Sequence, residues 1–213
     1  MRITYEHELE ELNKCLRDMA MMVEKAIEQT FVAFEDQNYT MAEDVIKGDR
    51  NVNDMERAIE SRCLSLILRQ QPVARDLRVI SSALKMISDM ERIGDQASDI
   101  VELAQYIKKS DVKYKTHLSD MANEVIKMVT KSIKSFVKKD IEMARNVIVY
   151  DDVVDNYFEE IKKELIRIIS SGESDGEEFI DILMIAKYLE RIGDHATNIA
   201  EWVEYSILGY HAE

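Results

Sequence analysis

The chain has 213 residues, of which 46% are hydrophobic and 33% charged, and its formal net charge is −14. So negative a chain is a poor partner for nucleic acid or an anionic membrane, and its surface favours cations or basic patches on other proteins. The two cysteines, Cys15 and Cys63, have no CxxC spacing, which argues against a disulfide framework and a thiolate zinc site. With no leader peptide and no run of about eighteen apolar residues, the sequence predicts a soluble protein of the cytoplasm.

Apolar residues recur at every third or fourth position along nearly the whole chain, which is the spacing of α-helices. Short polar breaks separate the helices. Asn38 follows the first helix and can cap the second, Pro72 ends the second, and Lys139-Asp140 repeats the first break. The polar segment 108–117 is the best linker candidate. We therefore expect helices near residues 4–35, 39–70, 73–108, 117–138, 141–170 and 175–208.

The second half of the chain repeats the first. AFEDQNYTMAEDVIKGD at 33–49 aligns with SFVKKDIEMARNVIVYD at 135–151, and MERIGDQASDI at 90–100 aligns with LERIGDHATNI at 189–199. This internal repeat predicts an all-α fold of two tandem three-helix bundles, with six long antiparallel helices related by a pseudo-repeat. The two predicted domains are residues 1–110 and 111–213.

Each ERIGD phrase begins a stripe of polar, mostly acidic side chains that lies almost opposite the apolar stripe on a helical wheel. The stripes are Glu91, Asp95, Asp99 and Glu102 in the first repeat, and Glu190, Asp194, Asn198 and Glu201 in the second. Like charges four residues apart repel by about a few tenths of a kcal/mol, and no lysine is placed between them to relieve the repulsion. The pattern favours a bound ligand, and a solvated acidic face is the alternative.

The preceding helix of each repeat carries a matching pair four residues apart. Side chains at equal distance from the turn of an antiparallel hairpin lie level with one another. The level pairs are Asp49 with Asp95, Asn53 with Glu91, Asp151 with Asp194, and Asp155 with Glu190. Each hairpin is therefore predicted to bring four oxygen-bearing side chains together.

Such oxygen clusters suit hard cations such as magnesium, calcium or manganese, and also iron. The second cluster is predicted to be the more complete site, because Asp155, Glu190 and Asp194 are all charged whereas Asn53 of the first is neutral. Gly94 repeats as Gly193 inside its helix, at a cost of about 1 kcal/mol relative to alanine. The recurrence indicates either the close approach of a neighbour or ion, or simple packing.

These features closely resemble the PhoU family of phosphate transport system accessory proteins. The resemblance is carried by the doubled ERIGD phrase, QQPVARDLR at 70–78 and the upstream Asp49 and Asp151 pairs, and it covers nearly the whole chain. It implies two three-helix bundles side by side. It also implies a cytoplasmic regulator that restrains phosphate uptake, acting between a phosphate ABC transporter and a sensor histidine kinase.

The resemblance further implies multinuclear iron or zinc clusters on paired E(D)xxxD motifs. The corresponding residues are Asp49, Asn53, Glu91, Asp95 and Asp99 in the first repeat, and Asp151, Asp155, Glu190, Asp194 and Asn198 in the second. Asn53 and Asn198 stand where family members often have aspartate. Asparagine offers a carbonyl oxygen but no charge, so this chain departs from the pattern there.

Three functions follow as alternatives. The first is a non-enzymatic regulatory adaptor. The second is a metal-dependent enzyme built on the same carboxylates, although the sequence lacks Glu-x-x-His pairs, a Gly-rich phosphate loop and a Cys/His nucleophile pair. The third is a structural interaction bundle whose acids are only solvated. Metal analysis of protein purified without chelator would separate the third from the others.

An adaptor acts through its contacts, and the resemblance points to the transporter's ATPase subunit and to the kinase as partners. Arg75 and Arg78, just after Pro72, are predicted to touch a partner, because arginine is enriched in protein interfaces. The alternative is a salt bridge within the chain, to Asp76 or a neighbouring helix. We further expect a homodimer that reaches the membrane surface only through its partners.

Overall fold

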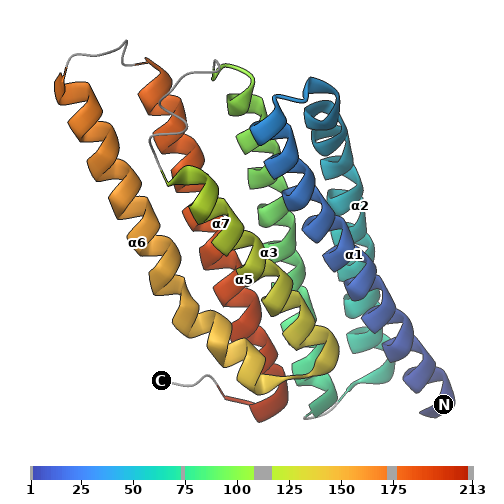
Figure 1. The fold of residues 1–213 in the computed structure, drawn as a ribbon. Coiled ribbons are helices and arrows are strands. Elements are labelled where there is room, and N and C mark those ends of the chain that lie inside the picture. The colour runs from blue at the N-terminus through green and yellow to red at the C-terminus, as the bar shows by residue number, and fades with distance from the viewer. Residues whose placement is uncertain (1, 73–74, 108–116, 172–176, 211–213) are drawn as a thin grey trace.

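The computed structural model describes residues 2–72, 75–107, 117–171 and 177–210, and its helices stand side by side (Figure 1). They are α1 (Arg2–Asp36), α2 (Tyr39–Gln70), α3 (Arg75–Ala104), α5 (Leu118–Lys138), α6 (Ile141–Ser171) and α7 (Glu177–Leu208). The predicted all-α fold is confirmed, with the six predicted long helices present in the described residues. The largest boundary error is at the end of α3, which stops at Ala104 rather than at 108. Apart from His117, the predicted linker lies outside the described residues.

The first break in each repeat uses the same capping chemistry. Asn38 Oδ1 and Asp140 Oδ1 each accept a hydrogen bond from the backbone amide three residues later, which satisfies a free donor at the helix start. The preceding residues, Gln37 and Lys139, adopt left-handed backbone with φ of 52° and 54°. The predicted cap at Asn38 is confirmed, and Asp140, in the predicted second break, caps α6 in the same way.

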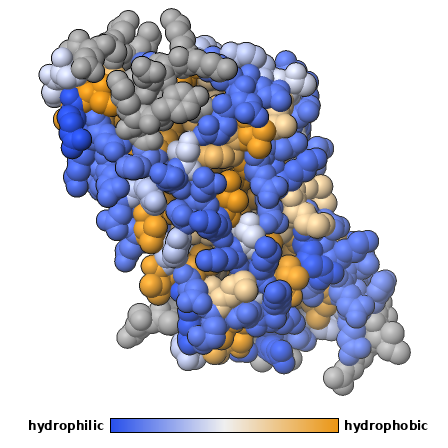
Figure 2. Space-filling view, in the orientation of Figure 1, coloured by the Kyte–Doolittle hydropathy of each residue, from blue (hydrophilic) through white to orange (hydrophobic). Residues whose placement is uncertain are grey.

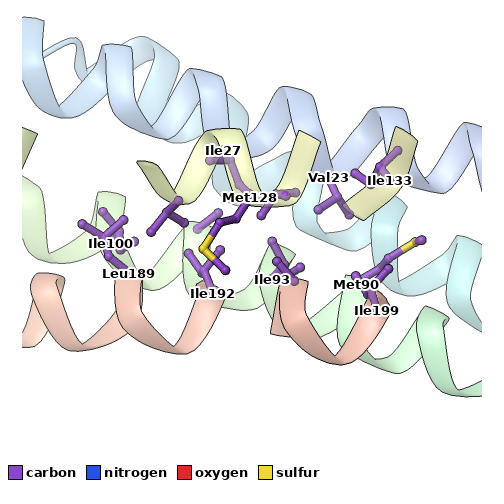
Figure 3. Packing of buried hydrophobic residues seen from close by; sticks show 14 of the residues in the cluster. Val23, Ile27, Met90, Ile93, Ile100, Met128, Ile133, Leu189, Ile192 and Ile199 are labelled. Carbon is purple, nitrogen blue, oxygen red and sulfur yellow. The ribbon is translucent and has the colours of Figure 1, made fainter. Parts of the chain in front are cut away.

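The two three-helix bundles share one core. In the first repeat α1 packs against α2 and α3, and in the second α5 packs against α6 and α7. The long helices α3 and α7 lie against each other and join the two repeats, and α1 also contacts α5. Figure 3 shows the result: Ile27 of α1, Ile93 of α3, Met128 of α5 and Ile192 of α7 belong to the same buried cluster.

Position in the bundle explains how wide an apolar face each helix needs. The central helix α3 packs against three other helices and buries twelve residues along its length, whereas the flanking helix α2 buries six along a single stripe. The flanking helices α2 and α6 therefore keep most of their surface in water. The acidic motifs lie where these helices meet α3 and α7.

The face shown in Figure 2 is mostly hydrophilic, with narrow strips of apolar side chains between the hydrophilic ones. Large exposed apolar side chains also occur near the α2–α3 and α6–α7 hairpin ends: Leu64, Leu68, Leu77, Ile166, Ile169 and Ile180. None of the described helices has the length and apolar character needed to cross a bilayer.

Candidate functional site

Two clusters of polar side chains lie on the predicted hairpins. We call Asp49, Asn53, Glu91 and Asp95 the first cluster, and Asp151, Asp155, Glu190 and Asp194 the second cluster. In three of the four predicted level pairs the two carboxylates lie close enough to raise a pKa, as the sequence predicts: Asp49 with Asp95, Asp151 with Asp194, and Asp155 with Glu190. In the fourth pair, Asn53 contacts Asp49 on its own helix, at 3.2 Å from Nδ2 to Oδ2, instead of Glu91 on α3.

The first cluster contains buried oxygens without donors. Asp49 Oδ1 and Asn53 Oδ1 are both shielded from solvent, and neither accepts a hydrogen bond. Burial raises the pKa of Asp49, and the nearby Asp95 carboxylate raises it further. The pKa of Glu91 is raised by burial, then by Asp95 and Glu56. These side chains are partly withdrawn from water, so the cluster differs from a fully solvated acidic face.

In the second cluster, neighbouring side chains of the protein supply both a hydrogen-bond donor and a positive charge. Burial raises the pKa of Asp151 to about 6, even though the Thr197 hydroxyl donates to Asp151 Oδ1 at 3.2 Å and thereby favours the charged form. Burial and Glu190 raise the pKa of Asp155 and of Asp194, while Lys187 opposes both shifts.

The glycine that recurs in the ERIGD helices permits close approach of the neighbouring helix. A Cβ on Gly94 would lie 3.4 Å from Val52 Cγ1 and 3.6 Å from Asp49 Oδ1. A Cβ on Gly193 would lie 3.3 Å from Val154 Cγ1, with Asp151 Oδ1 at 3.7 Å. At both glycines the structure shows a valine and an aspartate of the neighbouring helix close to the backbone. Close approach of a neighbour and packing are thus the same contact here.

As the side chains stand, no group of three or more His, Cys, Asp or Glu within the described ranges is arranged so that it could hold a metal ion. The chemistry of the first cluster nevertheless fits a hard cation, because Asp49 Oδ1 and Asn53 Oδ1 are buried acceptors that lack a donor. Neither cluster includes a histidine or cysteine, so the oxygen donors suit magnesium, calcium, manganese or iron better than zinc. Rotation of the more exposed carboxylates, such as Asp95, would be needed to close a shell.

Comparison with known proteins places both halves of the chain in one family. A family model described as the PhoU domain matches residues 16–104 and again residues 118–203. The chain belongs to the PhoU family. A PhoU homolog from Clostridium acetobutylicum, named a phosphate-specific transport system accessory protein, is 38% identical over 98% of this chain and 96% of its own length. The Escherichia coli accessory protein PhoU is 32% identical over 95% of this chain and 84% of its own length.

The fold agrees with that assignment. The crystal structure of PhoU from Pseudomonas aeruginosa superposes with a TM-score of 0.89 at 32% identity, covering 97% of this chain and 100% of that one. The sequence-based recognition of the PhoU family is thus confirmed. The two family-model matches, one in each repeat, also agree with the duplication found in the sequence.

In this PhoU chain, two of the predicted ligand residues contact the opposite repeat. Asn198 Nδ2 donates to Asp89 Oδ1 at 3.1 Å, and His195 Nδ1 lies 2.8 Å from the same oxygen. The Tyr188 hydroxyl lies within hydrogen-bonding reach of Asp99. Asp99 and Asn198 therefore join α3 to α7, a role that the sequence analysis did not predict. His195, which has no metal-ligand spacing in the sequence, has a structural partner in Asp89.

The two arginines predicted to bind a partner differ in their surroundings. Arg75, the first residue of α3, is exposed. Arg78 is half-buried, and its guanidinium lies so close to Gly209 that a Cβ there would come within 2.8 Å of Nη1. Gly209 has a φ of 86°, so glycine suits this position for both its backbone and its lack of a side chain. Of the pair, Arg75 is the side chain more available to another protein.

Sequence analysis missed one charged side chain of this PhoU site. Lys187, one turn before Glu190 on α7, forms an ion pair with it, so the second acidic stripe does have a lysine beside it. The signal was present as a Lys-x-x-Glu spacing. It was missed because Lys187 precedes the ERIGD phrase and has no counterpart in the first repeat, where Ser88 occupies the aligned position.

Proposed function

We propose that this protein is a cytoplasmic, non-enzymatic regulator of phosphate uptake. It acts as an adaptor between the ATPase subunit of a phosphate ABC transporter and a sensor histidine kinase that responds to phosphate starvation. The supporting observation is similarity over both repeats to proteins named as phosphate-specific transport accessory proteins. This similarity spans nearly all of the chain, so we assign the proposed function to the two repeats together and not to one of them.

Cation binding is part of this proposal. In the first repeat the ligands are Asp49, Asn53, Glu91 and Asp95, and in the second they are Asp151, Asp155, Glu190 and Asp194, with Asp99 and Asn198 adjoining them at the α3–α7 contact. A bound hard cation would supply the positive charge that offsets repulsion among these carboxylates. The protein's part is to hold the oxygens of two helices at one level, so that occupancy links α2 to α3 and α6 to α7.

The α2–α3 hairpin end is the proposed contact with a partner. The exposed guanidinium of Arg75 is on the same hairpin end as Leu68 and Leu77, whose side chains are 79% and 42% exposed. An arginine beside accessible leucines resembles the composition of protein interfaces. We also propose that the protein forms a homodimer, which analytical ultracentrifugation would detect.

The test of the adaptor role is a pull-down with the ATPase subunit and, separately, the cytoplasmic part of the kinase. Arg75→Glu is the variant, and Arg17→Glu, which reverses an exposed charge on α1, is the matched control. We expect wild type and the control to retain both partners, and Arg75→Glu to weaken at least one contact. If Arg75→Glu binds both partners as wild type does, the contact surface is wrong. If wild type binds neither partner, the adaptor role itself is contradicted.

Metal content is measured separately on protein purified without chelator. We expect divalent cation to be retained by wild type and lost from the first cluster in Asp49→Asn/Asp95→Asn. Protein that retains no metal and whose melting temperature does not respond to divalent cations would support the structural interaction bundle instead.

A further inference from the structure

We propose that Lys187 is a resident counter-ion of the second cluster and makes the two clusters unequal. The first cluster then takes up a divalent cation readily, and the second does so only when the Lys187 ammonium moves away. The cation-binding half of this inference rests on the proposed function. It reverses the expectation from sequence, in which the second cluster was the more complete site because more of its members are charged.

The contacts of Lys187 hold its ammonium at the cluster. Its Nζ forms an ion pair with Glu190 Oε2, one turn further along α7. The same Nζ lies 5.3 Å from the centroid of the Phe158 ring on α6, which is within the range of a cation–π interaction. Lys187 therefore bridges the two helices that carry the second cluster. This is the position in which an external cation would also act.

The exposure of Lys187 leaves its ammonium free to move away from Glu190 into solvent. The side chain of Glu190 is only 15% exposed, whereas that of Lys187 is 45% exposed. The ammonium thus reaches a sheltered carboxylate from the solvent side, and a long lysine side chain can rotate away without disturbing the core.

The first cluster lacks both parts of this arrangement. Ser88 stands at the position of Lys187, and Glu56 at the position of Phe158. The Ser88 hydroxyl donates to Glu56 Oε1 at 3.3 Å, so the aligned positions hold a hydroxyl and a carboxylate instead of an ammonium and an aromatic ring. The donorless oxygens of Asp49 and Asn53 lie in this cluster, while Asp151 Oδ1, the counterpart of Asp49 Oδ1, already accepts from Thr197.

The counter-ion itself is tested without metal. Melting temperatures are measured in chelator at low salt for wild type, Lys187→Gln and the reciprocal variant Ser88→Lys, which places an ammonium three residues before Glu91. We expect Lys187→Gln to melt lower than wild type and Ser88→Lys to melt higher, with both differences shrinking at high salt. Lys134→Gln, an exposed lysine on α5, controls for loss of one positive charge. If the Lys187 and Ser88 variants both melt like wild type, the proposal is overturned.

The inequality of the clusters is tested by titrating the chelator-treated proteins with Mn²⁺ and following calorimetry and the Mn²⁺ paramagnetic signal. Wild type should show two Mn²⁺ sites, a tighter one that Asp95→Asn removes and a weaker one. Lys187→Gln should raise the affinity of the weaker site by roughly tenfold, which corresponds to about 1.4 kcal/mol. Ser88→Lys should weaken the tighter site. Equal sites in wild type, unmoved by Lys187→Gln, would overturn the inequality.

The two measurements separate the two ideas. If no variant binds Mn²⁺, the cation sites of the proposed function are contradicted and the inequality falls with them. In that case the melting temperatures still decide whether Lys187 is a counter-ion. If Mn²⁺ binds but Lys187→Gln changes neither melting nor affinity, the cation sites stand and the role of Lys187 is refuted.

Discussion

Replacing Asp151 with asparagine should stabilise the metal-free protein at neutral pH and leave it unchanged in acid. Burial raises the pKa of Asp151 from an ordinary 3.8 to about 6, so the folded protein holds its proton more tightly than the unfolded chain does. The tighter binding of this proton adds to the free energy of unfolding. That contribution is fully present below pH 3.8 and is lost as the pH rises through about 6. A shift of about two units corresponds to about 3 kcal/mol, and solvent screening at this partly exposed side chain reduces that to about 1–2 kcal/mol.

The assay is urea unfolding followed by helical circular dichroism, in chelator, at pH 7.5 and at the lowest pH at which both proteins remain folded. Asp151→Asn keeps an oxygen that can accept from Thr197, so only the charge is removed. We expect the variant to exceed wild type by about 1–2 kcal/mol at pH 7.5, and the difference to shrink towards pH 4. Glu160→Gln, at an exposed glutamate on the same helix, controls for net charge. A difference that is equal at both pH values, or a variant less stable than wild type at pH 7.5, would refute this reasoning.

Two further predictions concern packing. Gly48→Ala should raise the free energy of unfolding by about 0.5–1 kcal/mol, because its Cβ would meet nothing within 4 Å, whereas Gly193→Ala should gain less or lose stability, because its Cβ would crowd α6 at 3.3 Å. If urea unfolding showed equal gains at both sites, the packing of α6 against α7 would have room for a Cβ at Gly193, contrary to this reasoning. Tyr188→Phe should cost about 1–1.5 kcal/mol by removing a donor from Asp99 across the repeats, while Tyr39→Phe, at an exposed tyrosine, should change little. A Tyr188→Phe protein that unfolds like wild type would remove this contact from the forces joining the repeats.

Local signals in the sequence were sufficient to predict the helices and the level of the acidic pairs. Caps such as Asn38 and Asp140 act within one turn, so their effect does not depend on the rest of the fold. Register within a hairpin depends only on chain length and the position of the turn. Asp49 meets Asp95 because equal numbers of residues separate them from Pro72, and no knowledge of the other helices is required.

The contact between the repeats could not be predicted in the same way. It depends on how α3 and α7 dock, and neither turn length nor helical period fixes that docking. Asp99 and Asn198 follow the acidic stripe on a helical wheel, so the sequence groups them with the ligands. In the fold, α3 and α7 lie against each other, and these two side chains reach Tyr188 and Asp89 on the opposite helix.

The duplication also hides differences in charge between the repeats, because an alignment of two repeats emphasises the residues that they share. The shared ERIGD phrase predicts the same backbone arrangement in both repeats, and the structure agrees, since a Cβ added to Gly94 or Gly193 would lie 3.4 Å from Val52 Cγ1 or 3.3 Å from Val154 Cγ1. The difference lies one turn outside the phrase, where a single ammonium at Lys187 contacts Glu190. Charges act over several ångströms, so a residue outside a motif can decide whether the motif binds a cation. A duplicated site can therefore become asymmetric through one substitution that leaves every motif residue unchanged.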